Sequence, residues 1–191
     1  MIPAPDTPSF ENLHAEYAPR VRSYLRKFVD ATEAEDLTQE VFLSVHRNLA
    51  TFRGHAKLST WIFQIATHAA LDRLRSPSHR CPPSAPTGAL EDHPEHATPS
   101  HESQSLHAEM CRCIRSLVDE LPVDFRTIIH LSELKELKLG EIAQILDITP
   151  GAAKIRLHRA RRTLKERMEK DCRILLDERA ELQCDRRQSK S

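Results

Sequence analysis

The densest group of chemically active side chains lies near the C-terminal end of the sequence, and it is cationic. Between Lys154 and Lys170 the chain has eight Lys and Arg residues against Glu166 and Glu169, a net charge of +6 in 17 positions. Cations at this density bind phosphate groups, and a guanidinium can also pair with the acceptor edge of guanine. These residues indicate contact with nucleic acid, and a solvated basic helix face is the alternative.

Catalytic chemistry has little support in the sequence. It contains no Gly-rich phosphate loop, no nucleophile elbow, no His-Glu-x-x-His motif and no convincing carboxylate pair. We therefore expect a protein that is not an enzyme and that needs no cofactor.

Metal or thiol chemistry is the second possibility, because His and Cys gather in the middle of the chain. Their spacing matches no paired Cys-x-x-Cys arrangement, so we expect no metal site among them: His79, Cys81, His93, His96, His101, His107, Cys111 and Cys113. Cys172 and Cys184 are weak metal candidates that bracket a tail, which is apolar enough near Ile174 for a short helix. Redox sensing and docking of a regulator are alternatives for this pair, and two incidental thiols are the preferred interpretation.

Apolar residues recur at intervals of three and four, which predicts helices throughout. Stripes of this kind run over 10–28, 37–49, 61–74, 106–121 and 122–134. The stretch 77–105 instead is rich in Pro, His and Ser and has few large apolar residues, so it cannot form a core. We predict an all-α fold of two small helical domains, 10–76 and 106–168, joined by the flexible acidic linker 77–105 and followed by the tail 169–191.

The net charge of the chain hides a strong asymmetry between these segments. Its 28 Lys and Arg residues balance 28 Asp and Glu residues. Residues 1–76 are neutral, 77–110 carry −4 and 111–191 carry +4. No apolar run is long enough to span a membrane, and the five Cys residues without an export signal fit a reducing cytoplasm.

The basic stretch belongs to a pattern of two helices joined by a tight turn. Glu141 to Leu146 reads as the first helix, and Thr149 and Pro150 are a good N-cap and first residue for the second. Ala153, Leu157 and Ala160 then form a buried stripe. This pattern predicts a helix-turn-helix whose second helix enters the major groove. The groove residues would be Ala152, Lys154, Ile155, Arg156, Arg159, Arg161 and Arg162. Ala152 and Ile155 could meet a thymine methyl group or simply pack.

Three motifs together resemble a known family. The segments 34–45, 58–66 with 70–75, and 141–161 are similar to bacterial RNA polymerase sigma factors of the sigma-70 family, extracytoplasmic-function (ECF) group. The resemblance implies a protein that binds core RNA polymerase and directs it to promoter DNA, with the first domain on the −10 element and the second on the −35 element. A stand-alone helix-turn-helix regulator, and a metal- or thiol-responsive interaction protein, are the alternatives. An anti-sigma protein is a further partner that the group often has.

The resemblance also assigns residues in the first domain. Core polymerase would contact Asp36, Gln39, Glu40, Phe42 and Ser44, with Phe42 as the apolar anchor. The −10 strand would contact Arg53, His55, Lys57, His68, Arg73 and Arg75. Thr67-His68 stands where the family usually has Arg-Asn, so one basic contact is missing. Trp61 lies on an apolar stripe, which favours a core role over base stacking.

Overall fold

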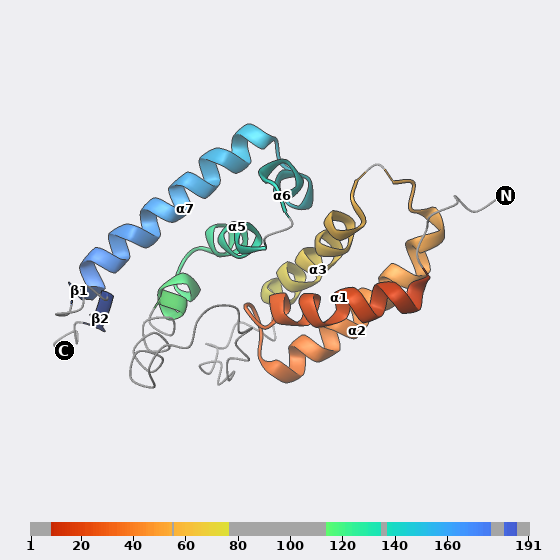
Figure 1. The fold of residues 1–191 in the computed structure, drawn as a ribbon, viewed down its shortest axis with the longest axis horizontal. Helices are drawn as coiled ribbons and strands as arrows, with labels where there is room; N and C mark the ends of the chain where they lie inside the picture. Colours follow the sequence, from red (N-terminus) through yellow and green to blue (C-terminus); the bar gives the residue numbers. More distant parts are fainter. Residues whose placement is uncertain (1–8, 55, 77–113, 135–136, 177–181, 187–191) are drawn as a thin grey trace. The chain divides into compact units, whose positions relative to one another are not determined.

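The computed structural model describes residues 9–54, 56–76, 114–134, 137–176 and 182–186, with the backbone alone from residue 171 onward. Helices make up two stretches of the chain, before and after 77–113 (Figure 1). Each stretch is all-helical up to residue 171, as the sequence predicts. The predicted linker 77–105 lies outside the described residues. None of the described helices is long and apolar enough to cross a membrane.

The N-terminal stretch contains helices α1 (Phe10–Leu25), α2 (Ala31–Asn48) and α3 (Leu58–Arg75), with the short 3-10 helix η1 (Leu49–Thr51) after α2. Side chains cap the first two helices. The Ser9 Oγ accepts from the backbone N–H of Asn12 at 3.3 Å, and the Asp30 Oδ1 accepts from that of Glu33 at 2.9 Å. Such caps satisfy N–H groups that a first helical turn leaves without partners.

The core of these three helices forms around Tyr24. Its ring makes edge contacts with Phe28 and Phe63, with centroids 5.1 and 5.6 Å away. Leu13, Val21, Leu25, Val41, Val45 and Ile62 are also fully buried. Each such aliphatic side chain contributes about 1.5–3 kcal/mol relative to exposure, so burial rather than helix propensity holds this bundle together.

The C-terminal stretch begins with a helical segment over 114–119, followed by α5 (Val123–Glu133), α6 (Leu139–Ile145) and α7 (Pro150–Asp171). Leu117, Ile128 and Leu131 are fully buried in it. Arg167 of α7 forms an ion pair with Glu120 at 3.1 Å. The helices 106–121 and 122–134 that the sequence predicts are therefore confirmed over 114–119 and 123–133, with a turn at 120–122 between them.

The tail differs from the sequence-based expectation. The predicted short helix around Ile174 is wrong, because this stretch forms strand β1 (Cys172–Leu176), which pairs antiparallel with β2 (Leu182–Arg186). In this register Ile174 lies opposite Cys184, and Cys172 opposite Arg186. Five residues are too few for a stable isolated helix, whereas strand pairing satisfies backbone groups over the same length.

Candidate nucleic-acid interface

The turn between α6 and α7 has the geometry that the helix-turn-helix pattern requires. Asp147 has a φ of 52°, in the left-handed region, and reverses the chain after α6. The N–H of Ile148 donates to the Ala143 carbonyl at 3.0 Å. The Thr149 hydroxyl then accepts from the N–H of Ala152 at 3.2 Å, which confirms Thr149 as the N-cap of α7.

The start of α6 is also fixed by a side chain. The Glu141 carboxylate accepts from the backbone N–H of Lys138 at 2.6 Å. This hydrogen bond to the backbone lowers the pKa of Glu141 and keeps the carboxylate charged. The orientation of the helix that precedes the turn is therefore set by a local contact.

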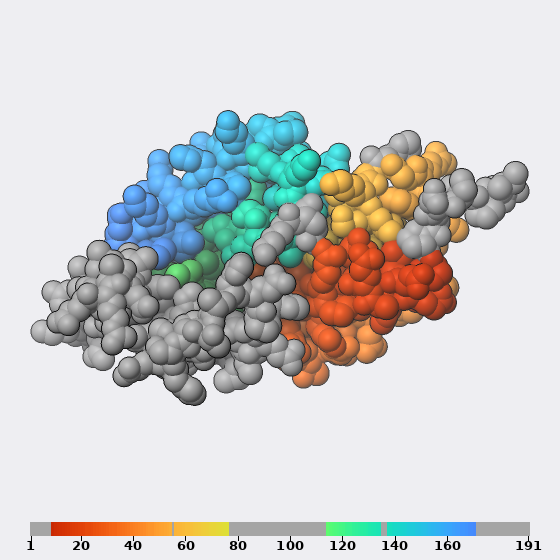
Figure 2. Space-filling model, viewed as in Figure 1, coloured from red at the N-terminus to blue at the C-terminus, as the bar shows by residue number. Residues whose placement is uncertain are grey.

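Helix α7 has a buried face and an exposed face. The surface of this helix is the blue part of Figure 2. Ala153 and Ala160 are fully buried, whereas Ile155, which lies on the opposite side of the helix, is 55% exposed. All the predicted groove residues are exposed except Arg156, which is half-buried: Ala152, Lys154, Ile155, Arg159, Arg161 and Arg162. The structure thus presents the predicted set to solvent.

The cations of α7 are used differently along its length. In the later turns, Arg162 lies 3.3 Å from Glu166 and Lys165 lies 3.7 Å from Glu169. Within the described part of the chain, Lys154, Arg159 and Arg161 take part in no ion pair. Positive charge that is open to a phosphate is therefore concentrated in the first half of the helix.

The loop before α3 holds the next predicted contacts. Arg53 and Lys57 are exposed, and Gly54 has a φ of 71°, a conformation that suits glycine. His55 lies outside the described residues. Trp61 is half-buried with its ring centroid 5.1 Å from that of Phe52. The partial burial and this ring contact agree with a packing role for Trp61.

On α3 the predicted −10 contacts His68, Arg73 and Arg75 differ in their surroundings. His68 is exposed, and the side chain of Arg75 is 70% exposed. Arg73 instead pairs with Glu33 at the start of α2. Its Nε donates to Glu33 Oε1 at 2.6 Å, and the Glu33 side chain is only 13% exposed. Nothing in the local sequence signals this contact, because the two residues are forty positions apart.

Thr67 occupies the position beside His68 where the family usually has a basic residue. It is fully buried, donates to the Phe63 carbonyl at 2.7 Å, and shares a hydrogen bond with the Tyr24 hydroxyl at 2.9 Å. In this protein the position faces the core, so a cation there could not reach DNA.

The predicted polymerase-contact residues lie on α2, and one of them requires correction. Asp36, Gln39 and Glu40 are exposed and Ser44 is half-buried. Phe42 is only 2% exposed, and its ring packs against that of His14, with the two ring centroids 4.8 Å apart. Phe42 therefore does not present the apolar surface expected of it. Its neighbour Leu43, at 56% exposed, does.

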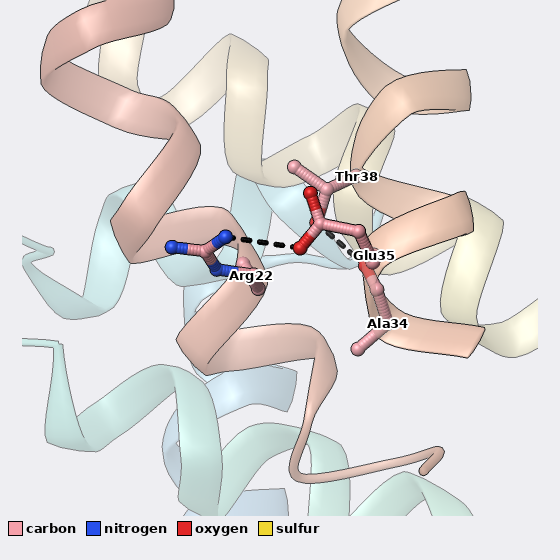
Figure 3. A network of polar contacts seen from close by, with 4 residues as sticks. All are labelled: Arg22, Ala34, Glu35 and Thr38. Atoms are coloured by element: carbon pink, nitrogen blue, oxygen red, sulfur yellow. Dashed lines mark hydrogen bonds and ion pairs between the residues drawn. The ribbon is translucent and has the colours of Figure 1, made fainter. Parts of the chain in front are cut away.

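A groove of about 270 Å³ lies between α1 and α2 beside this polar face. Arg22 of α1 reaches Glu35 of α2 across 2.9 Å, and Thr38 donates to the Ala34 carbonyl at 2.6 Å (Figure 3). Gln39 belongs both to the groove lining and to the predicted polymerase-contact set. The Arg22–Glu35 pair connects α1 to α2 at the rim of this groove.

Metal binding finds no support in the part of the chain that is described. It contains no group of three or more His, Cys, Asp or Glu side chains that could hold an ion. The His- and Cys-rich stretch 79–113 lies entirely outside that part. Cys172 and Cys184 are described by their backbone alone, so their candidacy stays a prediction.

A helix-turn-helix with an exposed basic helix, and a separate helical bundle with a polar and partly apolar face, define a class of protein: a two-domain, helical transcription protein. The Sigma-70 region 2 family model matches residues 13–80, and the Sigma-70, region 4 model matches residues 111–164. The chain belongs to the sigma-70 family of RNA polymerase sigma factors, in its ECF group. It directs promoter-specific transcription initiation with RNA polymerase, and it is not an enzyme.

The relatives agree in length as well as in family. The chain is 30% identical over 172 residues to the ECF RNA polymerase sigma-E factor of Escherichia coli K12, covering 86% of this chain and 88% of the relative. It is 29% identical over 171 residues to the ECF sigma-E factor of Haemophilus influenzae, covering 86% and 89%. These relatives favour initiation with polymerase over a stand-alone regulator.

Two solved structures share the fold. One is CnrH in complex with the cytosolic domain of CnrY, with a TM-score of 0.61 and 21% identity over 85% of this chain and 88% of CnrH. The other is the sigma factor RpoE in complex with the anti-sigma factor NepR from Bartonella quintana, with a TM-score of 0.63 and 18% identity over 85% and 98%.

Proposed function

We propose that promoter recognition is divided between two domains of this sigma factor. The domain 10–76 binds core polymerase and contacts the −10 element. The domain 106–168 reads the −35 element, the linker 77–105 joins the two domains, and the tail 169–191 follows. The observation that carries the proposal is the exposed face of α7, which is opposite its buried stripe and carries unpaired cations in its first half.

For the −35 element, the exposed residues of α7 divide by position on the helix. Ala152, Ile155 and Arg159 are neighbours at spacings of three and four on the exposed side of the helix, and they are the candidates for base edges. Lys154, Arg156, Arg161 and Arg162 complete the proposed set, chiefly as phosphate contacts.

For the −10 element, we assign the loop and the exposed side of α3. Donors to bases and phosphates are Arg53, His55, Lys57, His68 and Arg75. Arg73 belongs to the same group by sequence, but its guanidinium already pairs with Glu33. We therefore propose Arg73 as a residue that holds α3 against α2 and Arg75 as the phosphate contact.

For core polymerase, we assign Asp36, Gln39, Glu40 and Ser44 of α2. Carboxylate and amide groups on an exposed helix face complement a basic partner surface. The exposed side chain of Leu43 supplies the apolar contact in place of Phe42. Apolar anchors surrounded by polar groups are typical of energetic centres in interfaces.

Two partner and location assignments complete the proposal. CnrH was solved with CnrY and RpoE with the anti-sigma factor NepR, so we propose an anti-sigma protein as a regulator of this chain as well. We place the chain in the cytoplasm, where it meets core polymerase.

In-vitro transcription with purified core enzyme tests the division between domains. On a promoter whose −10 region is pre-opened by mismatches, we expect activity lost through Arg75→Ala to return, because strand capture is then easier. Activity lost through Arg159→Ala should stay low on that template. Rescue of both variants, or of neither, would contradict the assignment of the two elements to separate domains.

A further inference from the structure

One exposed side chain on α7 has the wrong chemistry for a solvated or phosphate-binding surface. Three large apolar residues of the described chain are exposed: Leu43 at 56%, Ile155 at 55% and Val123 at 36%. Ile155 lies in the second turn of α7, directly opposite the fully buried Ala153 and Ala160. It is 55% exposed, so packing against the described part of the chain covers less than half of it.

The surface around Ile155 leaves room for a close approach. Gly151, one turn earlier on the same face, has no side chain, and a Cβ placed there would meet no atom within 4 Å. Ala152, also on this face, carries only a methyl group. Ile155 therefore projects above its N-terminal neighbours on this face.

The charges beside Ile155 define what kind of partner fits. Lys154 and Arg156 flank it on either side, and Arg159 follows one turn later on the same face. Such an arrangement suits a polyanion that brings an apolar group to the centre of the contact. In the DNA major groove the thymine C5-methyl is the one apolar group among the base edges. A base edge with only donors and acceptors would lose hydrogen bonds to water against this side chain.

We infer that Ile155 is a specificity-determining residue that selects a thymine in the −35 element by contact with its 5-methyl group. This inference rests on the proposed role of α7 in reading that element. It goes further by naming the base and the chemical group that is read.

The experiment removes the proposed methyl contact in two ways, once from the DNA and once from the protein. Reconstituted holoenzyme first enriches promoter fragments from sheared genomic DNA of the host. The best promoter is then synthesised with each −35 thymine replaced singly by deoxyuridine, which lacks only the methyl group. Competition binding compares the wild-type chain with Ile155→Ala, and with Val123→Ala as a matched control at an exposed apolar site. Alanine is a good helix former, so neither variant threatens α5 or α7.

One deoxyuridine position should weaken binding of wild-type and Val123→Ala holoenzyme about fourfold, the value expected for one buried methyl group. Ile155→Ala holoenzyme should bind the thymine and deoxyuridine promoters equally at that position. The inference is overturned if deoxyuridine weakens binding of Ile155→Ala holoenzyme by the same factor as wild type at every position. It is also overturned if deoxyuridine weakens binding of wild-type holoenzyme at no position. Enrichment of no promoter, with no transcription, would instead overturn the proposed function, and this inference would fall with it.

Discussion

Individual arginines on α3 serve two different purposes. Arg73 donates to a carboxylate that is largely hidden from solvent, whereas Arg75, two residues later, extends into solvent with only a 3.9 Å contact to Asp72. A guanidinium that neutralises a half-buried carboxylate is hard to remove, because the carboxylate would be left without its counter-charge. An exposed guanidinium is free to exchange solvent for a phosphate.

Arg75→Ala should weaken promoter binding by holoenzyme and reduce the slope of log K against log salt by about 1, the effect of one lost phosphate contact. Arg73→Ala should leave the slope unchanged but lower the free energy of unfolding by about 1–2 kcal/mol. Binding titrations at several salt concentrations and urea unfolding of the chain alone measure the two effects. A reduced salt slope for Arg73→Ala would show that Arg73 reaches DNA after all.

The Tyr24–Thr67 hydrogen bond makes a second prediction for single residues. Burial raises the pKa of Tyr24 well above its usual value, since the interior disfavours the phenolate. The neutral hydroxyl therefore stabilises the fold fully below the unfolded-state pKa of about 10, and this contribution declines as the pH rises beyond it.

Tyr24→Phe should cost about 1 kcal/mol at pH 8, the net value of one buried hydrogen bond. The difference from wild type should shrink between pH 8 and pH 11, because phenylalanine has no proton to lose. Urea unfolding at a series of pH values measures both the cost at pH 8 and its decrease toward pH 11. A difference that stays constant over this range would mean that Tyr24 does not carry the alkaline loss of stability.

Helix α2 combines a buried apolar side with an exposed polar side, which we propose as the polymerase contact. Its buried stripe includes Leu37, Val41 and Val45, and its other side carries Asp36, Gln39 and Glu40. The Arg22–Glu35 pair connects α2 to α1, and Glu33–Arg73 connects it to α3. The helix that carries the exposed carboxylates is therefore paired with a neighbouring helix on each of two sides, in addition to its buried stripe.

Asp36→Arg should weaken binding to core polymerase at least about tenfold, or 1.4 kcal/mol, because it places a cation against a basic surface. Nonspecific binding of the full chain to DNA should not fall. Glu16→Arg on exposed α1 is the matched charge reversal and should bind polymerase as wild type does. Pull-down or fluorescence titration with core enzyme measures the effect, and equal loss in both variants would point to bulk charge rather than to this site.

The positive and negative charges of the whole molecule sum to zero, and this neutrality affects its association with DNA. A neutral chain has no long-range attraction to a polyanion, and its cations are concentrated in the C-terminal part. The two DNA contacts that we propose are joined by a linker, so the effective concentration of the second contact depends on how well the linker matches the spacing of the two elements. A polymerase that holds both domains at the promoter spacing would raise this effective concentration.

The isolated chain should therefore bind promoter and non-promoter duplexes with nearly equal affinity, and addition of core enzyme should create a preference of at least about a hundredfold. Competition binding with and without core enzyme at fixed salt tests this difference. A strong promoter preference of the chain by itself would show that polymerase is not needed to join the two contacts.

Local sequence patterns determined much of the secondary structure of this protein, because helices and their caps form between residues that are close in sequence. Apolar residues at spacings of three and four determined the helices. Thr149-Pro150 determined the start of α7, since the cap bonds to an N–H only three residues away. The cluster of cations in α7 likewise determined a nucleic-acid partner, and the motifs on α2, α3 and α7 determined the family.

Only the tertiary structure decided which polar and apolar side chains of these helices are available. It buried Phe42 and exposed Leu43, enclosed Thr67 with Tyr24, and paired Arg73 with Glu33. It also formed a hairpin where a helix was expected, because strand pairing depends on a second segment. Each of these outcomes depends on contacts between different segments of the chain, and periodicity along one segment carries no information about them.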